Sequence, residues 1–229
     1  MNTQNNDKKP MTILRSGVRR PDWVCRNVNQ NVVLVRDRSG SMTGSKANDA
    51  SAASLDLVAE LADPCNKNGF NVAVVDFSGR SKIVHSLEKA SALNCRVAPL
   101  SVGFFGGGTN ITAGLEDAHS ILEKANNSGQ EGLTLLRPVV IVFTDGCHNA
   151  GPGPLDIGVR LKAIADIVTV AFGTDADEHL LREVASTPQH FYRCSSGREL
   201  RKFLAAFGAT MSTTLAAGKN ATQALSNIQ

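Results

Sequence analysis

The chain has 229 residues, of which 42% are hydrophobic and 20% charged, and its formal net charge at pH 7 is +3. This length suits one α/β domain with a short extension and is too short for two domains of ordinary size. The small net charge gives nucleic-acid binding no support, and no apolar run is long enough to cross a bilayer. We therefore expect neither nucleic acid nor a membrane among its partners.

The beginning of the chain and its cysteines indicate a cellular location. The first thirty residues lack the apolar core of a secretory signal, and the five cysteines form no Cys-x-x-Cys pair. We therefore expect a cytoplasmic protein with reduced thiols. Residues 1–28 are predicted to be an N-terminal extension whose basic side chains are either a solvated arm or a docking arm. Within it, Trp23 and Cys25 are the side chains that could pack on the core.

The predicted elements then alternate between strands and helices. Short, β-branched apolar runs are typical of strands covered on both faces, and they span residues 32–35, 72–75, 139–143 and 167–172. Apolar residues three and four apart predict helices at residues 50–61, 111–125 and 200–211. The alternating stretch 83–87 predicts an antiparallel edge hairpin, and residues 190–194 predict another edge strand.

This order of elements predicts the fold class. We expect a doubly wound α/β fold with an open, mostly parallel sheet, one antiparallel edge strand and helices on both faces. The domain should span residues 29–215. Residues 216–229 are small and polar without a clear apolar face, so we expect a flexible C-terminal tail.

Three short stretches carry small oxygen-bearing side chains next to apolar runs. They are Asp37-Arg38-Ser39-Gly40-Ser41, Gly107-Gly108-Thr109-Asn110 and Thr144-Asp145-Gly146. Loops at the carboxyl ends of parallel strands converge, so all three are predicted at one rim of the sheet. Their two carboxylates and three hydroxyls form a hard oxygen set that suits Mg²⁺ or Mn²⁺. No nucleophile with an obvious base accompanies them.

Each stretch alone also has a simpler interpretation. Asp37 and Ser41 could be helix N-caps, and the glycines could only permit turns. Lys46, at the start of the following helix, is interpreted as a capping residue rather than a ligand. Arg38 is either solvated or able to bind an incoming carboxylate. Cys147 and His148 raise the possibility of zinc or a reactive thiol, which the oxygen-rich set disfavours.

Together, the three stretches resemble the metal-ion-dependent adhesion site (MIDAS) of the von Willebrand factor A family, in its bacterial intracellular type. The resemblance covers roughly residues 30–212 and rests on three motifs in the right order. It implies that Ser39, Ser41 and Thr109 bind the ion directly. It also implies that Asp37 and Asp145 bind it directly or through water, and that a glutamate or aspartate of a protein partner completes the shell.

The resemblance implies a non-enzymatic, divalent-cation-dependent protein-interaction module. Such modules work in multi-protein systems with an AAA ATPase, or with the kinase and phosphatase of tellurite-resistance-like clusters. One alternative is a metal-dependent phosphohydrolase or nucleotide binder, although the glycine-rich loop lacks a phosphate-loop lysine and no aspartate stands two residues after Asp37. Another alternative is a structural subunit with a vestigial metal site.

Overall fold

The computed structural model describes residues 28–99, 107–127 and 132–228; the predicted N-terminal extension lies almost wholly outside them. The strands are β1 (Val28–Asp37), β2 (Phe70–Phe77), β3 (Ser81–Lys89), β4 (Thr134–Thr144), β5 (Asp166–Phe172) and β6 (Phe191–Cys194). The helices are α2 (Ser45–Leu61), α3 (Ala90–Leu93), α4 (Ile111–Asn127), α5 (Leu155–Ile164), α6 (Glu178–Val184), α7 (Gly197–Ala216) and α8 (Thr222–Leu225). Two 3₁₀ turns, η1 (Pro64–Asn66) and η2 (Pro188–His190), complete the described elements.

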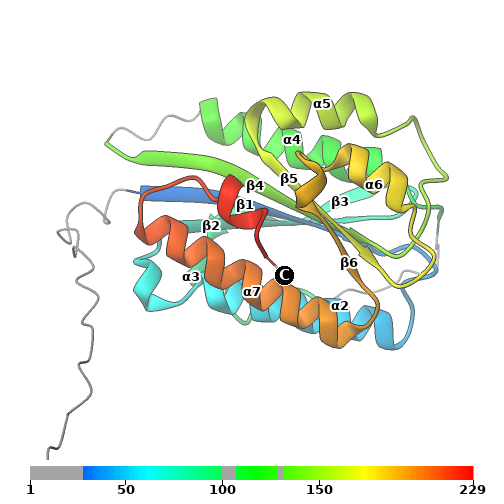
Figure 1. Cartoon of the computed structure of the whole chain (residues 1–229), viewed down its shortest axis with the longest axis horizontal. Helices are drawn as coiled ribbons and strands as arrows, with labels where there is room; N and C mark the ends of the chain where they lie inside the picture. Colours follow the sequence, from blue (N-terminus) through cyan, green and yellow to red (C-terminus); the bar gives the residue numbers. More distant parts are fainter. Residues whose placement is uncertain (1–27, 100–106, 128–131, 229) are drawn as a thin grey trace, which may run out of the picture.

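The strands form one sheet in the order β3-β2-β1-β4-β5-β6. Neighbouring strands are parallel except β2 and β3, which are antiparallel. Helices α2, α3 and α7 cover one face, and α4, α5 and α6 cover the other (Figure 1). Parallel neighbours require crossover connections, which place helices on both faces. The predicted fold class is therefore confirmed.

The central strands are buried on both faces because their apolar side chains alternate between two cores. In β1, Val32 and Leu34 join the core beneath α2 and α7, whereas Val33 and Val35 join the core beneath α4 and α5. The strands are longer than their apolar runs, and β1 begins at Val28 rather than near residue 32. Its polar start is compatible with burial because the Gln30 amide donates to the carbonyl of Arg137, at 2.8 Å.

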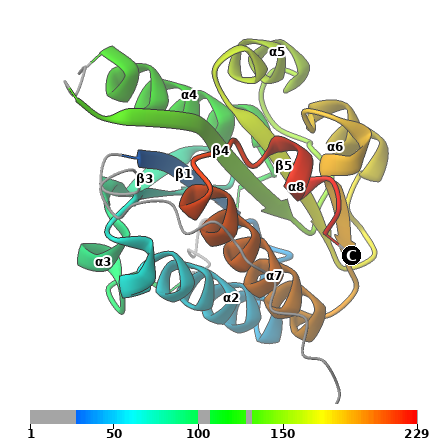
Figure 2. The ribbon, with the colours of Figure 1, turned by 60° about the vertical axis from the view of Figure 1, so that its left-hand side comes forward.

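Helices α2 and α7 lie side by side on their face of the sheet (Figure 2). Two glycines of α7 allow the close approach. A Cβ atom at Gly208 would lie 2.7 Å from Cγ of Glu60, and one at Gly197 would lie 2.0 Å from Oδ2 of Asp49. A side chain at either position would therefore require Glu60 or Asp49 to move, or the two helices to separate.

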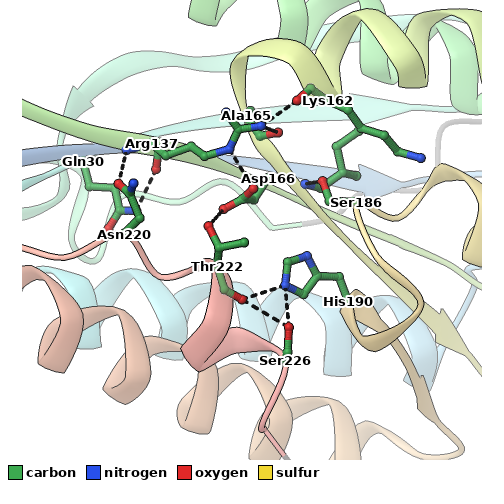
Figure 3. Close-up of polar contacts among 11 residues, drawn as sticks. Gln30, Arg137, Lys162, Ala165, Asp166, Ser186, His190, Asn220, Thr222 and Ser226 are labelled. Atoms are coloured by element: carbon green, nitrogen blue, oxygen red, sulfur yellow. Dashed lines mark hydrogen bonds and ion pairs between the residues drawn. The ribbon is translucent and has the colours of Figure 1, made fainter.

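The C-terminal segment is a correction to the predicted flexible tail. Helix α7 continues to Ala216, and the residues after it bury Ala221 and Leu225 completely. Contacts between polar side chains hold the same segment (Figure 3): the Thr222 hydroxyl donates to Asp166, and Nε2 of His190 lies 2.9 Å from the Thr222 carbonyl oxygen. The prediction failed because a four-residue helix is too short to show a period.

Asp166 connects this segment to the sheet. Its Oδ1 accepts a hydrogen bond from Nε of Arg137 at 2.7 Å, while its other oxygen accepts from Thr222. The backbone N–H of Arg137 in turn donates to Asn220 Oδ1 at 2.9 Å. The end of the described chain is thus tied to β4 and β5 by charge-assisted bonds. No helix in the described ranges is long and apolar enough to span a membrane.

We predict that Leu225→Ala lowers the free energy of unfolding by about 2–5 kcal/mol, as for other buried leucines, because it leaves a cavity under α8. Gln223→Ala, an exposed change on the same helix, is the control and should stay within about 0.5 kcal/mol of the wild type. Urea unfolding followed by circular dichroism measures both. Equal midpoints for the two variants would show that α8 is not docked in solution.

Candidate metal centre

The first and third oxygen-bearing stretches follow β1 and β4, which are parallel neighbours. Asp37 is the last residue of β1, and Asp145 comes directly after β4. The strand order changes direction between these strands, since β2 and β3 lie on one side and β5 and β6 on the other. Open α/β sheets bind ligands beyond the carboxyl ends of the strands at such a switch point.

Hydrogen bonds connect these two stretches. The Ser41 hydroxyl donates to Asp145 Oδ1 at 2.6 Å and lies 3.1 Å from the Ser39 hydroxyl. The backbone N–H of Ser39 donates to Asp37 Oδ1 at 2.7 Å, and the Thr144 hydroxyl donates to Asp37 Oδ2. Both carboxylates are 0% exposed, so the backbone and three hydroxyls replace the water that they lose on folding.

The second stretch meets the others at Gly146. A Cβ atom there would lie 3.1 Å from Thr109 Oγ1 and 3.7 Å from Ser41 Oγ, so the hydroxyls of two loops face the same small space. The structure therefore brings the five predicted site residues to one rim. Their role as metal ligands stays a prediction.

Asn149, which the sequence analysis did not single out, holds the threonine loop. Its Oδ1 accepts a hydrogen bond from the backbone N–H of Thr109 at 2.7 Å, and its own N–H donates to the Thr109 carbonyl at 3.0 Å. Gly108 makes room for this bridge, because a Cβ atom there would lie 2.1 Å from Asn149 Oδ1. Asn110 precedes α4 and caps it by accepting from the N–H of Ala113 at 3.1 Å.

Cys147 and His148 do not form a soft metal site. The Cys147 thiol donates to the carbonyl of Asp175 at 3.3 Å, and Nδ1 of His148 accepts from the backbone N–H of Ile111 at 3.2 Å. Within the ranges that the structure describes, no three histidine, cysteine, aspartate or glutamate side chains gather in a possible metal cluster. The candidate donors are thus two carboxylates and hydroxyls.

Lys46 brings a positive charge to the site. Its ammonium forms an ion pair with Asp145 Oδ2 at 2.5 Å, and its side chain is 33% exposed. The interpretation of Lys46 as a capping residue is therefore wrong: the side chain reaches back to the carboxylate instead of to a helix end. The ammonium therefore compensates part of the negative charge that is buried at Asp145.

The carboxylates carry an electrostatic cost. Burial raises the pKa of Asp37, hydrogen bonds from Thr144 and Ser39 lower it, and the nearby charge of Asp145 raises it further, with a net increase. One ammonium does not balance two buried carboxylates, whereas a divalent cation would. The all-oxygen donor set fits a hard divalent ion, which would compete with the Lys46 ammonium for Asp145.

Sequence comparisons relate the chain to known proteins. A family model, the von Willebrand factor type A domain, matches residues 31–206. Inter-alpha-trypsin inhibitor heavy chain H4 of Sus scrofa is 30% identical over 169 residues, which are 69% of this chain and 17% of that protein. Heavy chain H1 of Mesocricetus auratus is 30% identical over 165 residues, 68% of this chain and 17% of that one. The chain thus spans less than a fifth of these curated relatives.

Solved structures share the fold. Proximal thread matrix protein 1 from the mussel byssus superposes with a TM-score of 0.66 and 21% identity, over 83% of this chain and 48% of that one. That structure is described as having a zinc-occupied MIDAS motif. The von Willebrand factor type A protein of Catenulispora acidiphila also has a TM-score of 0.66, with 19% identity over 81% of this chain and 43% of that one. At these identities the likeness concerns the fold alone.

We predict that Asp37→Asn raises the free energy of unfolding of the metal-free protein at pH 7. Because the pKa of Asp37 is raised on folding, its contribution to stability is present at low pH and is lost as the pH rises through the folded-state value. Asparagine removes this cost and keeps an oxygen for the Ser39 N–H. Urea unfolding in EDTA should show a gain that shrinks as the pH falls toward the ordinary aspartate pKa. A less stable variant at pH 7 would contradict the electrostatic argument.

We also predict that Lys46→Met binds divalent cations about three to ten times more tightly than the wild type, because the ammonium no longer competes for Asp145. The gain should be larger at low ionic strength, since salt screens the repulsion between ammonium and metal. Calorimetric titration with Mg²⁺ and Mn²⁺ measures it. Lys46→Arg keeps the charge and should bind like the wild type. Weaker binding by Lys46→Met would mean that the lysine orients Asp145 for the ion.

Proposed function

Because this chain belongs to the von Willebrand factor type A domain family, we propose that it is a divalent-cation-dependent protein-interaction module with a MIDAS at the rim of its sheet. The proposed ligands, direct or through water, are Asp37, Ser39, Ser41, Thr109 and Asp145. One observation carries the proposal: two fully buried carboxylates end adjacent parallel strands, and the Ser41 hydroxyl connects the two loops. Buried carboxylates are costly for stability, so their presence at a ligand-binding rim favours a functional role.

The proposed partner group is an acidic side chain. An octahedral cation held by these hydroxyls and carboxylates keeps at least one position for water or for an incoming oxygen ligand. When bound, the cation supplies a positive centre that attracts a carboxylate. Arg38 follows Asp37 in the first loop, and its positive charge would add a second attraction for a glutamate or aspartate of the partner.

The choice of Mg²⁺ or Mn²⁺ rests on the donor atoms, because carboxylate and hydroxyl oxygens suit hard cations. The mussel protein with a zinc-occupied MIDAS motif makes Zn²⁺ the necessary comparison in any titration. We expect Mg²⁺ and Mn²⁺ to bind with the oxygen ligands alone, because hard cations prefer oxygen to the Cys147 thiol and the His148 imidazole. The thiol contacts Asp175 and Nδ1 of His148 contacts Ile111, whereas Nε2 of His148 has no partner among the described residues.

The cellular setting also stays a proposal. We propose a bacterial, cytoplasmic protein in a multi-protein system with an AAA ATPase, or with a kinase and phosphatase as in tellurite-resistance-like clusters. The curated relatives described above are animal proteins, so this setting rests on the motif sequence alone. A cytoplasmic location would be tested by fractionating cells that express the full-length protein.

Metal binding should depend on Asp145. In calorimetric titrations with Mg²⁺, Mn²⁺ and Zn²⁺, Asp145→Ala is expected to lose at least tenfold in affinity for Mg²⁺ and Mn²⁺, because it removes one of two charged ligands. Asp175→Ala is the matched control: this exposed carboxylate lies in the loop that the Cys147 thiol contacts, and its loss should leave the affinity unchanged. Equal heats in the wild type and Asp145→Ala would indicate a vestigial site.

Partner capture should depend on the same ion. The immobilised wild-type protein is expected to retain partners from a lysate in Mg²⁺, to release them in EDTA, and to retain few after Asp145→Ala. A synthetic peptide copied from a retained partner should lose binding when its glutamate or aspartate is changed to the amide. Retention of every partner in EDTA would refute the adhesive role, and phosphoester turnover that disappears in Asp37→Ala would establish the enzymatic alternative.

A further inference from the structure

A second candidate binding region lies at the opposite end of the sheet from the metal rim. A cavity of about 600 Å³ opens there, between the first residues of β1 and β4, part of β3 and the end of α4. Figure 1 shows these element ends gathered at one side of the domain. The lining is mixed, and its large apolar side chains are Ile83, Leu87, Ile121, Leu133 and Leu135. Its size is typical of a site that encloses a side chain or a small ligand.

The walls leave apolar surface unprotected. Ile83 is 39% exposed and Leu135 is 44% exposed, and both are among the few large hydrophobic side chains that the described residues expose. Both line the cavity, whereas the other two exposed large hydrophobic side chains, Leu155 and Val159, lie on α5. An apolar patch beside a cavity marks a site that something else covers.

Four asparagines, Ser86 and Lys124 form the polar part of the lining. Asn29 and Asn31 are 6% and 3% exposed, and Asn71 donates to Asn31 Oδ1 at 2.8 Å. The Asn29 amide oxygen accepts only a long contact, 3.5 Å, from the ammonium of Lys89. In the described ranges, no hydrogen bond reaches the amide oxygen of Asn71. The cavity thus combines apolar walls with available acceptors, which suits an aromatic group that carries one N–H donor.

Strand β1 begins beside this cavity. Twenty-seven residues precede β1, whose first residue, Val28, pairs with Thr134 between the lining residues Leu133 and Leu135. The chain's only tryptophan, Trp23, stands five residues before Val28. Five extended residues reach at most about 17 Å, which gives Trp23 enough length to reach a cavity beside the start of β1.

We propose that the side chain of Trp23 occupies this cavity and covers Ile83 and Leu135, with its indole N–H donating to an asparagine oxygen. A buried tryptophan contributes a large apolar area and needs one acceptor for its N–H, and the cavity offers both. Covalent connection gives Trp23 a millimolar effective concentration at the site, which favours it over a free ligand of moderate affinity. This inference is independent of the proposed metal function.

The single tryptophan makes the test direct, because all indole fluorescence of the full-length protein comes from Trp23. In the wild type we expect blue-shifted emission and weak acrylamide quenching. Leu135→Asp and Ile83→Asp place a charge in the cavity wall and should each give a red shift and a several-fold rise in the quenching constant. Val159→Asp is the control: this side chain is 68% exposed on α5, and the change should leave the emission unaltered.

Circular dichroism shows whether each variant is folded, and sedimentation gives its oligomeric state. Solvent-exposed emission in the folded wild type would overturn the proposal. So would unchanged emission in both folded wall variants. If the wild type is a dimer that Leu135→Asp converts to monomers without changing the emission, a second copy of the chain covers the cavity and the proposal is wrong.

Discussion

The parallel pairing of β1 with β4 is the constraint on which the candidate site depends. It places Asp37 and Asp145 at the same rim, where neither carboxylate reaches water. Two neighbouring negative charges that are both buried destabilise a fold unless hydrogen bonds and positive charge compensate them. The surrounding loops supply that compensation: Ser39 and Thr144 donate to Asp37, while Ser41 and the Lys46 ammonium contact Asp145.

These contacts compensate the two buried charges only in part. The raised pKa of Asp37 shows that the hydrogen bonds do not repay the whole cost of burial. Glycine at positions 108 and 146 keeps the loops close enough for Asn149 and the hydroxyls to meet. For the proposed metal site, such preorganisation would lower the free-energy cost of assembling a coordination shell, because these side chains would need little rearrangement. The domain thus loses some folding stability by burying carboxylates in an arrangement that would suit an ion.

Much of this could be predicted from the sequence, and the exceptions have physical reasons. Continuous β-branched runs predicted the central strands and the fold class, because strands buried on both faces have few polar residues. The polar ends of β1 and β4 were missed, since Gln30 and Arg137 are accommodated by contacts across the sheet. The contacts of Asn149 with Thr109 and of Lys46 with Asp145 were also missed, because each joins residues that are far apart in sequence. Helices α5 and α6 bury too few apolar residues for a clear period.

The two ends of strand β1 lie at opposite ends of the sheet. Asp37 lies at one end and Asn29 at the other, eight residues apart, which corresponds to about 26 Å of extended chain. The two ends of β1 are therefore separate surfaces of the domain, with the packed sheet between them. Each end can serve as the control for the other when substitutions are tested for their effect on binding.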